Sequence, residues 1–152
     1  MRKTNIARGK YYMRVVIALL CLLAPLLIGA RAVSVPDYID FYTSEAGDTG
    51  FNGVLTVYDS RGSEIGPIGG NFTVEVYGDR DYQDKMFDRS FEVPSSGWGI
   101  WRLNKKVPAW GMPRISYDDI GEDLPEGLYV RAIFRPTDTP EKELTDKTTV
   151  WR

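Results

Sequence analysis

Carboxylates and aromatic rings are the side chains of this 152-residue sequence whose types and spacing could support chemistry. The chain contains no histidine, and its single cysteine, Cys21, lies in an amino-terminal apolar stretch. The rest of the chain therefore has no nucleophile–histidine pair and no imidazole or thiolate metal ligand. Two carboxylates could still hydrolyse a glycoside, and oxygen ligands could bind a hard cation. Because no spacing selects a catalytic pair, we expect no enzyme and keep a small carboxylate-based hydrolase as an alternative.

Acidic residues gather in two segments that we expect to be loops between strands. Calcium takes six to eight oxygen ligands, and loops at one end of a β-sandwich can supply them. The spacing lacks the glycine and the terminal glutamate of an EF-hand loop, so solvated acidic turns are the alternative to a calcium site. The candidate ligands are Asp79, Asp81 and Asp84 in the first segment, and Asp118, Asp119 and Glu122 in the second.

Aromatic residues are abundant, with 17 of them in residues 33–152. Trp98, Trp101 and Trp110 are concentrated in a short segment, and an exposed aromatic row beside acids is typical of carbohydrate-binding sandwiches. On a regular strand, Trp98 and Trp101 point to opposite faces because they are three residues apart. We therefore consider two hypotheses, a saccharide platform formed by these tryptophans with neighbouring tyrosines, and tryptophans that fill the core.

The elements that must position these residues are strands, because apolar and polar residues alternate along most of the chain. Clusters of Gly, Pro, Asp and Ser separate eight such segments, which predicts an all-β fold, a single antiparallel β-sandwich of about seven to eight strands. The segments are 38–43, 53–59, 72–77, 87–93, 98–103, 114–117, 128–135 and 144–151. Helix should be confined to short turns. The apolar phase of the best-alternating strands predicts a core of Phe72, Val74, Val76, Phe91, Leu128, Val130 and Phe134.

Residues 1–32 have the three parts of a signal peptide. Five basic residues precede an apolar run over 15–30, and the segment closes with Ala30-Arg31-Ala32. We expect cleavage after Ala32, a β-sandwich domain over residues 33–152 and a periplasmic or extracellular location. The alternative is an uncleaved anchor, although the run is short against the roughly 20 apolar residues that span a bilayer.

The charge of residues 33–152 restricts their partners. They hold 13 basic and 21 acidic side chains, a net charge of −8. This balance argues against nucleic acid and against an anionic membrane as the main partner. We expect an unknown protein or glycan of the exported compartment as partner, membrane contact only through a retained leader, and no cofactor apart from the calcium considered above.

Two segments carry a resemblance to known families. The first contains Gly53-Val-Leu-Thr-Val-Tyr-Asp59-Ser-Arg-Gly62 and then Pro67-Ile-Gly-Gly-Asn-Phe-Thr-Val74, and it resembles the opening hairpin of transthyretin-like and carboxypeptidase regulatory-like modules. The second, Leu124-Pro-Glu-Gly127-Leu-Tyr129, is similar to the approach to the sixth strand in fibronectin type III and other immunoglobulin-like domains. The chain also resembles small exported bacterial sandwich proteins. The resemblance implies a binding or structural module without an active site.

Overall fold

The computed structural model describes residues 34–152, without the side chains of residues 44–46. Residues 35–152 form one compact unit that contains all the described strands and their core. The expected signal peptide and its cleavage site lie outside the described residues. Within the described part, no helix has the length and apolar character needed to cross a bilayer.

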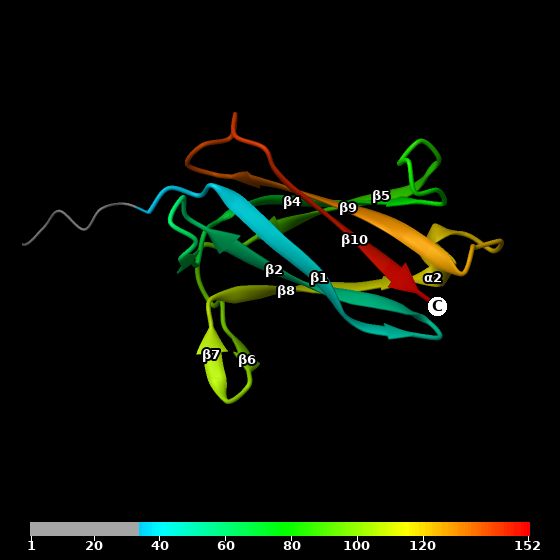
Figure 1. Ribbon diagram of the computed structural model, residues 1–152, viewed down its shortest axis with the longest axis horizontal. Coiled ribbons are helices and arrows are strands. Elements are labelled where there is room, and N and C mark those ends of the chain that lie inside the picture. Colours follow the sequence, from blue (N-terminus) through cyan, green and yellow to red (C-terminus); the bar gives the residue numbers. More distant parts are fainter. Residues whose placement is uncertain (1–33) are drawn as a thin grey trace, which may run out of the picture. The chain divides into compact units, whose positions relative to one another are not determined.

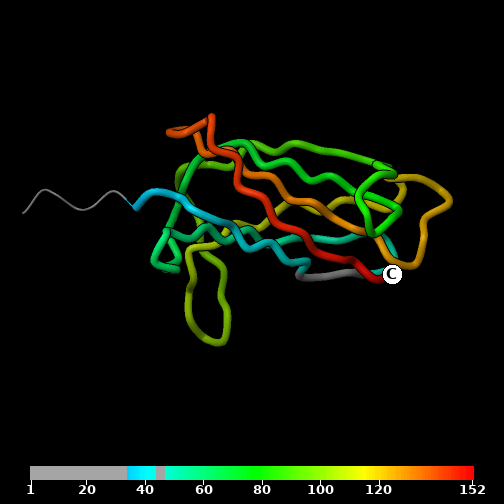
Figure 2. The backbone as a smooth tube through the Cα atoms, turned by 45° about the horizontal axis from the view of Figure 1, so that its top comes forward, coloured from blue at the N-terminus to red at the C-terminus, as the bar shows by residue number. Residues whose placement is uncertain are grey.

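Two antiparallel sheets stack face to face, as the ribbon and the tube views show (Figures 1 and 2). The first sheet contains β1 (Tyr38–Gly47), β2 (Gly50–Tyr58) and β8 (Ala109–Ser116), with the short β3 (Glu64–Ile65) paired to the end of β2. The second sheet has the order β10 (Leu144–Trp151), β9 (Gly127–Pro136), β4 (Gly70–Tyr77) and β5 (Lys85–Val93). The predicted all-β sandwich is confirmed.

A separate hairpin of β6 (Ile100–Arg102) and β7 (Lys105–Val107) projects from the sandwich in both views (Figures 1 and 2). The expected strand over 98–103 is the first arm of this hairpin, whereas β3 and β7 have no counterpart in the sequence prediction. The helix α2 (Tyr117–Ile120) is a single turn, and the Ser116 side chain accepts a hydrogen bond from the Asp118 backbone N–H. Among the described residues, helix is thus confined to a short turn, as expected.

The core lies between the two sheets. Six of the seven predicted core residues are fully buried, whereas Phe91 is half-buried against Trp110, with ring centroids 6.2 Å apart. The first sheet adds large buried side chains that the prediction omitted, because that prediction used only the best-alternating strands. These are Phe41, Phe51, Leu55, Val57 and Ile115.

A tight turn follows β2 and is organised by Asp59. The Asp59 Oδ1 accepts backbone hydrogen bonds from Arg61 and Ser63, each at 2.9 Å, and Gly62 has a φ of 76°. This is the chemistry expected of such a turn. The turn, however, leads into β3, and β4 belongs to the second sheet. Segments 53–59 and 72–74 therefore do not form the hairpin that the transthyretin-like resemblance implies, because residues 64–65 pair with β2 first.

The edge strands β1 and β10 come together along one side of the sandwich (Figures 1 and 2). The Asp146 carboxylate accepts hydrogen bonds from the backbone N–H groups of Phe41 and Lys147, each at 2.8 Å. An unpaired edge N–H of β1 is satisfied in this way, which protects an edge that would otherwise invite pairing with another chain.

Candidate functional site

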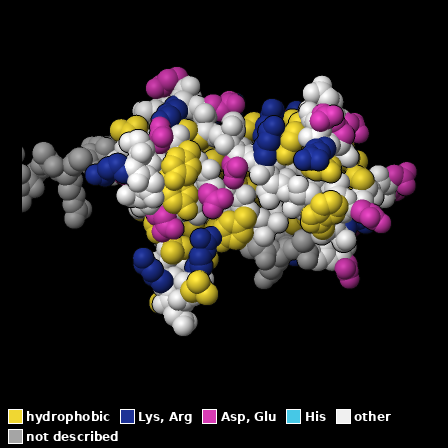
Figure 3. All heavy atoms as spheres, in the orientation of Figure 1, with side chains coloured by type: hydrophobic (Ala, Val, Ile, Leu, Met, Phe, Trp, Pro, Cys, Tyr) yellow, Lys and Arg dark blue, Asp and Glu magenta, His cyan; other side chains and the backbone are white. Residues whose placement is uncertain are grey.

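The outer face of the first sheet carries aromatic, acidic and basic side chains side by side. Because Ile39 and Phe41 point into the core, alternation places the neighbouring residues of β1 on the outside. Figure 3 shows hydrophobic and acidic side chains gathered there, above the projecting hairpin. We call this surface the tyrosine face, and it consists of Tyr38, Asp40, Tyr42, Tyr58, Glu64 and Arg102.

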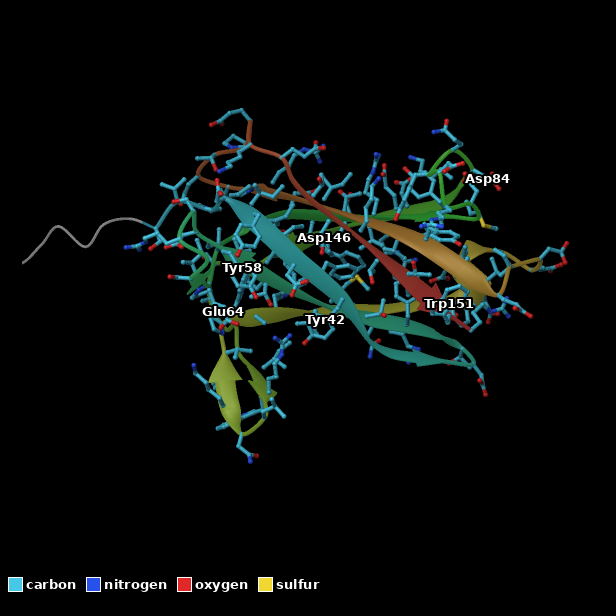
Figure 4. The ribbon with its side chains drawn as sticks, in the orientation of Figure 1. Tyr42, Tyr58, Glu64, Asp84, Asp146 and Trp151 are labelled. Carbon is cyan, nitrogen blue, oxygen red and sulfur yellow. The ribbon has the colours of Figure 1, made fainter. Side chains whose placement is uncertain are left out.

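A stacked tyrosine pair lies at one end of the tyrosine face. Tyr38 and Tyr58 are cross-strand partners, and their rings stack with centroids 4.8 Å apart and planes only 4° from parallel. Glu64 pairs with Tyr58 from the other side, so a row runs across three strands. Tyr38 remains 45% exposed, which leaves aromatic surface open to solvent. Figure 4 places Tyr42, Tyr58 and Glu64 on the side of the sheet from which the hairpin projects.

The β6–β7 hairpin borders this surface through a small apolar cluster of its own. Val107 packs with Val54 and Ala109, and Tyr42 and Ile100 contact the cluster. The Arg102 guanidinium then lies 4.8 Å from the centre of the Tyr42 ring. The hairpin thus fixes a cation beside the tyrosines, in a cation–π contact that restricts the guanidinium.

Electrostatics keep the polar groups of the tyrosine face in defined protonation states. Partial burial raises the pKa of Tyr58, and the nearby charges of Asp40 and Glu64 raise it further. A hydrogen bond with the Tyr42 side chain raises the pKa of Arg102 despite some burial. At neutral pH, Tyr58 therefore keeps its hydroxyl proton and Arg102 its charge, and both can donate hydrogen bonds to a ligand.

The two carboxylates of the tyrosine face are available as acceptors. Within the described residues, the side chains of Asp40 and Glu64 form neither an ion pair nor a hydrogen bond. Thr56, the cross-strand partner of Asp40, is 1% exposed, and its hydroxyl also has no partner among those residues. The Thr56 hydroxyl lies below the surface, whereas the carboxylates of Asp40 and Glu64 are open to water and keep their acceptor capacity for a ligand.

The three tryptophans of the expected platform do not share a face. Trp98 is 8% exposed, and its Nε1–H donates a 2.8 Å hydrogen bond to the carbonyl of Pro94. Trp110 is half-buried and meets Phe72 edge-on, with ring centroids 5.8 Å apart. Trp101 is 73% exposed on the hairpin. Trp98 and Trp110 therefore contribute to packing, and only Trp101 of the three is open to a partner.

The first acidic segment is largely occupied by its own loop. Asp79 accepts backbone hydrogen bonds from Asp81 at 3.2 Å, from Gln83 at 3.0 Å and from Asp84 at 2.7 Å. These bonds hold the turn after β4, at whose centre Tyr82 has a φ of 57°. The carboxylate of Asp79 therefore serves the turn in this structure, whereas Asp81 and Asp84 are exposed.

The second acidic segment surrounds α2. Asp118 and Asp119 are exposed in its single turn, Glu122 is exposed just after it, and Asp119 pairs with Arg89 at 3.0 Å. Within residues 34–152, apart from the side chains of 44–46, no three acidic side chains are grouped closely enough to hold a metal ion. Calcium binding by the two segments together stays a prediction.

A polar hollow of about 420 Å³ lies elsewhere, where the end of β5 meets the loop after β9. Its lining includes Glu92 and Asp138 but no aromatic residue. Ligand sites are usually lined by apolar and aromatic side chains with a few placed polar groups, so this hollow is a weaker candidate than the tyrosine face.

Sequence reasoning missed the tyrosine face although part of its signal was visible. Tyr38, Asp40 and Tyr42 occupy the non-core phase of the expected strand 38–43, which places them together on one outer face. The pairing of Tyr38 with Tyr58 depends on the register between β1 and β2, which includes a bulge between Thr43 and Glu45. The alternation of apolar and polar residues along each strand does not specify which residues of the two strands lie opposite one another.

Comparison with known proteins gives a distant structural likeness. No family model matches the chain, and no curated protein matches it. Among solved structures, the chain is similar to Tp47, the 47-kilodalton lipoprotein of Treponema pallidum, at 17% sequence identity and a TM-score of 0.44. The match covers 76% of this chain and 30% of that protein. The chain thus corresponds to less than a third of the length of that lipoprotein.

Proposed function

We propose that this chain is an exported, non-catalytic binding module of immunoglobulin-like type, and that the tyrosine face is its binding surface. The observation that carries the proposal is the stacked Tyr38–Tyr58 pair, which is partly exposed and flanked by the unpaired carboxylates of Asp40 and Glu64. Tyrosine is enriched at binding surfaces because its ring supplies contact area and its hydroxyl supplies a hydrogen bond. Export rests on the signal-peptide pattern of residues 1–32.

The immunoglobulin-like assignment is supported by the order of the long strands. If these are counted one to seven along the chain, the first sheet has the order one-two-five and the second has seven-six-three-four. A constant-type immunoglobulin domain has one-two-five-four and three-six-seven. The two arrangements differ in one strand, because β5 pairs with β4 here instead of with β8. Modules with this architecture act mainly by presenting a surface to a partner.

A saccharide is the ligand class that the residue types of the tyrosine face favour. The exposed part of the Tyr38 ring, which Tyr58 holds in place by stacking, can contact the apolar face of a sugar ring. The carboxylates of Asp40 and Glu64 can then accept hydrogen bonds from sugar hydroxyls, and Arg102 can donate to a sugar oxygen. This proposal replaces the tryptophan platform with a tyrosine platform on the first sheet.

The test is the binding of hexasaccharides of β-1,4-glucose, α-1,4-glucose and β-1,4-N-acetylglucosamine, measured by calorimetry. We expect one of them to bind, and Tyr38→Ala to weaken that binding by about tenfold, because an aromatic contact is worth on the order of 1 kcal/mol. Tyr129→Ala is the matched control, since Tyr129 lies half-buried on the other sheet. Equal loss in both variants would contradict a site on the tyrosine face.

A protein partner is the other outcome. If no saccharide binds, a photo-crosslinking residue at position 38 should capture a protein in the exporting cell, whereas the same residue at position 129 should not. Absence of an adduct at position 38, together with a negative saccharide panel, would overturn the tyrosine face as the binding surface.

The hydrolase alternative is tested with the same oligosaccharides. Two carboxylates at a suitable separation suffice for glycoside hydrolysis, and Asp40 and Glu64 are the unpaired acids of this surface. We expect no release of reducing ends during prolonged incubation. Release that disappears in Asp40→Asn or Glu64→Gln would replace the binding proposal with an enzyme.

A further inference from the structure

The tip of the β6–β7 hairpin exposes apolar surface that the fold does not use. Leu103 is 97% exposed and Trp101 is 73% exposed, the two highest values among the described large hydrophobic side chains. The hairpin projects away from both sheets, so its tip lies far from the core (Figures 1 and 2). Burial in the domain therefore accounts for neither side chain.

The backbone at the tip makes Leu103 still less favourable for folding. Leu103 and Asn104 form the two-residue turn, with φ angles of 48° and 64°. Turns with two positive φ angles strongly prefer asparagine and glycine, and leucine has no compensating local interaction there. A bulky residue held in a disfavoured conformation and exposed to water is a reason to look for a function at this position.

Cations surround this apolar tip. Arg102, Lys105 and Lys106 lie next to it in sequence, and the chain has no acidic residue between Glu92 and Asp118. Lys105 and Lys106 are exposed and form no ion pair within the described residues. Figure 3 shows the hairpin with basic and hydrophobic side chains, while the acidic ones stay on the sandwich. Residues 33–152 therefore contain a locally basic element, the β6–β7 hairpin, although their net charge is −8.

The pairing of the hairpin distributes these cations over both of its faces. Arg102 is opposite Lys105 on one face, and Trp101 is opposite Lys106 on the other, with Leu103 at the apex. A groove in a protein partner would contact mainly one face of such a hairpin. A planar anionic surface that receives the apex can meet cations of both faces.

We propose that the β6–β7 hairpin docks the module onto an anionic phospholipid surface. Leu103 and Trp101 enter the interfacial layer, where tryptophan is favoured, and Lys105 and Lys106 reach the lipid phosphates. The long stems of the lysines allow their ammonium groups to stay at headgroup level while the apex inserts. The tyrosine face, next to the base of the hairpin, is then held close to the membrane. The side chains proposed to meet the lipid, Leu103, Trp101, Lys105 and Lys106, are not part of the proposed ligand site, so the two proposals do not depend on each other.

Vesicle co-sedimentation tests the proposal with residues 33–152, which contain all the described strands and their core. We expect this chain to bind vesicles of equal parts phosphatidylglycerol and phosphatidylcholine at low ionic strength, and to dissociate as salt is added. Lys105→Glu combined with Lys106→Glu should weaken binding by more than about tenfold. Leu103→Asn and Trp101→Ala should each weaken it by about fivefold to tenfold.

Matched controls come from equivalent residues elsewhere on the surface. Trp151 is 66% exposed and Arg80 is an exposed cation, so Trp151→Ala and Arg80→Glu should leave vesicle binding unchanged. In a Trp151→Phe chain, Trp101 is the one strongly exposed tryptophan of residues 33–152, and its emission should shift to shorter wavelength on phosphatidylglycerol vesicles. Circular dichroism of each variant verifies the fold.

Three results would overturn the proposal. The first is that the chain does not bind vesicles that contain phosphatidylglycerol. The second is that it binds pure phosphatidylcholine vesicles equally well. The third is that the control substitutions weaken vesicle binding as much as the hairpin substitutions do. Because none of these measurements includes a saccharide, a negative result leaves the tyrosine face to its own test.

Discussion

The outer faces of the two sheets contain similar residue types but differ in how completely those residues are partnered. On the second sheet, the Glu75 carboxylate accepts hydrogen bonds from the Tyr77 hydroxyl at 2.8 Å and from the Arg131 Nε at 2.6 Å, and Lys85 lies 3.6 Å away. On the first sheet, the carboxylate of Glu64 has no such partner among the described residues.

The aromatic residues differ in the same way. Tyr82 meets the rings of Tyr77 and Tyr129 edge-on, at centroid distances of 5.2 Å and 6.3 Å. The ammonium of Lys147 then lies 4.1 Å from the centre of the Tyr82 ring, which completes the cluster. On the side of the first sheet, Tyr38 and the hairpin residue Trp101 keep large exposed areas, whereas on the second sheet the exposed aromatic ring is that of Trp151, at the end of β10. Internal partners stabilise the fold, whereas groups without them retain their bonding capacity for other molecules, and the two surfaces proposed to bind lie on the first sheet and its hairpin.

The largest expected difference is between the core and the hairpin. Phe134→Ala should lower the free energy of unfolding by about 3–5 kcal/mol, because Phe134 is fully buried and the change leaves a cavity. Trp101→Ala should change it by no more than about 0.5 kcal/mol, because that side chain is 73% exposed. Urea denaturation measures both. A comparable loss in the two variants would mean that Trp101 supports the fold and is not free for a partner.

A smaller difference is expected between the two glutamates. Glu75→Gln should cost about 1–2 kcal/mol of unfolding free energy, since it weakens charged hydrogen bonds that are only partly shielded from water. Glu64→Gln should stay within about 0.5 kcal/mol, as for an exposed residue without a side-chain partner. Urea denaturation of the two variants measures both changes in unfolding free energy. Equal costs would contradict the proposed contrast between a saturated face, whose polar groups have partners within the chain, and an unsaturated face, whose polar groups do not.

Much of the architecture could be predicted from alternation, since the strands of the second sheet are apolar on one side only. Phe72, Val74 and Val76 alternate with polar residues, and all three are buried. The first sheet was harder because β2 is apolar on both faces, and its outer Val54 is covered by the hairpin. Such coverage is a tertiary contact that local periodicity does not encode.

The candidate functional residues were predictable in type but not in position. Trp98, Trp101 and Trp110 stand out in composition, yet two of them pack inward, because a large ring is favoured wherever the core offers room. The tyrosine face depends on the register of β1 against β2 and on a projecting hairpin whose base packs against Val54. Both are long-range features, so a single sequence identifies the participants without showing which ones meet.

The pH dependence of stability provides a third test of the saturated face. Burial alone would raise the pKa of Glu75, but hydrogen bonds from Tyr77 and Arg131 outweigh it and hold the pKa below the ordinary 4.5. The unfolded chain then binds more protons than the folded chain near this pH, so stability falls as the pH drops below about 4.5. The difference in unfolding free energy between the natural chain and Glu75→Gln should therefore shrink as the pH falls from about 6 to about 3. A difference that is constant with pH would contradict the charged interaction.

The smallest expected effect concerns calcium, because one carboxylate in each acidic loop already has a partner. Asp79 is engaged by its own loop and Asp119 by Arg89, so binding a cation would require these contacts to be replaced. Millimolar calcium should therefore shift the melting temperature by less than about 1 °C relative to a chelator, since only a ligand that prefers the folded state raises it. A rise of several degrees that Asp79→Asn abolishes would show that the loop exchanges its internal hydrogen bonds for a metal ion. The saturated region would then also have a binding role, and the contrast between the two faces would no longer separate structure from function.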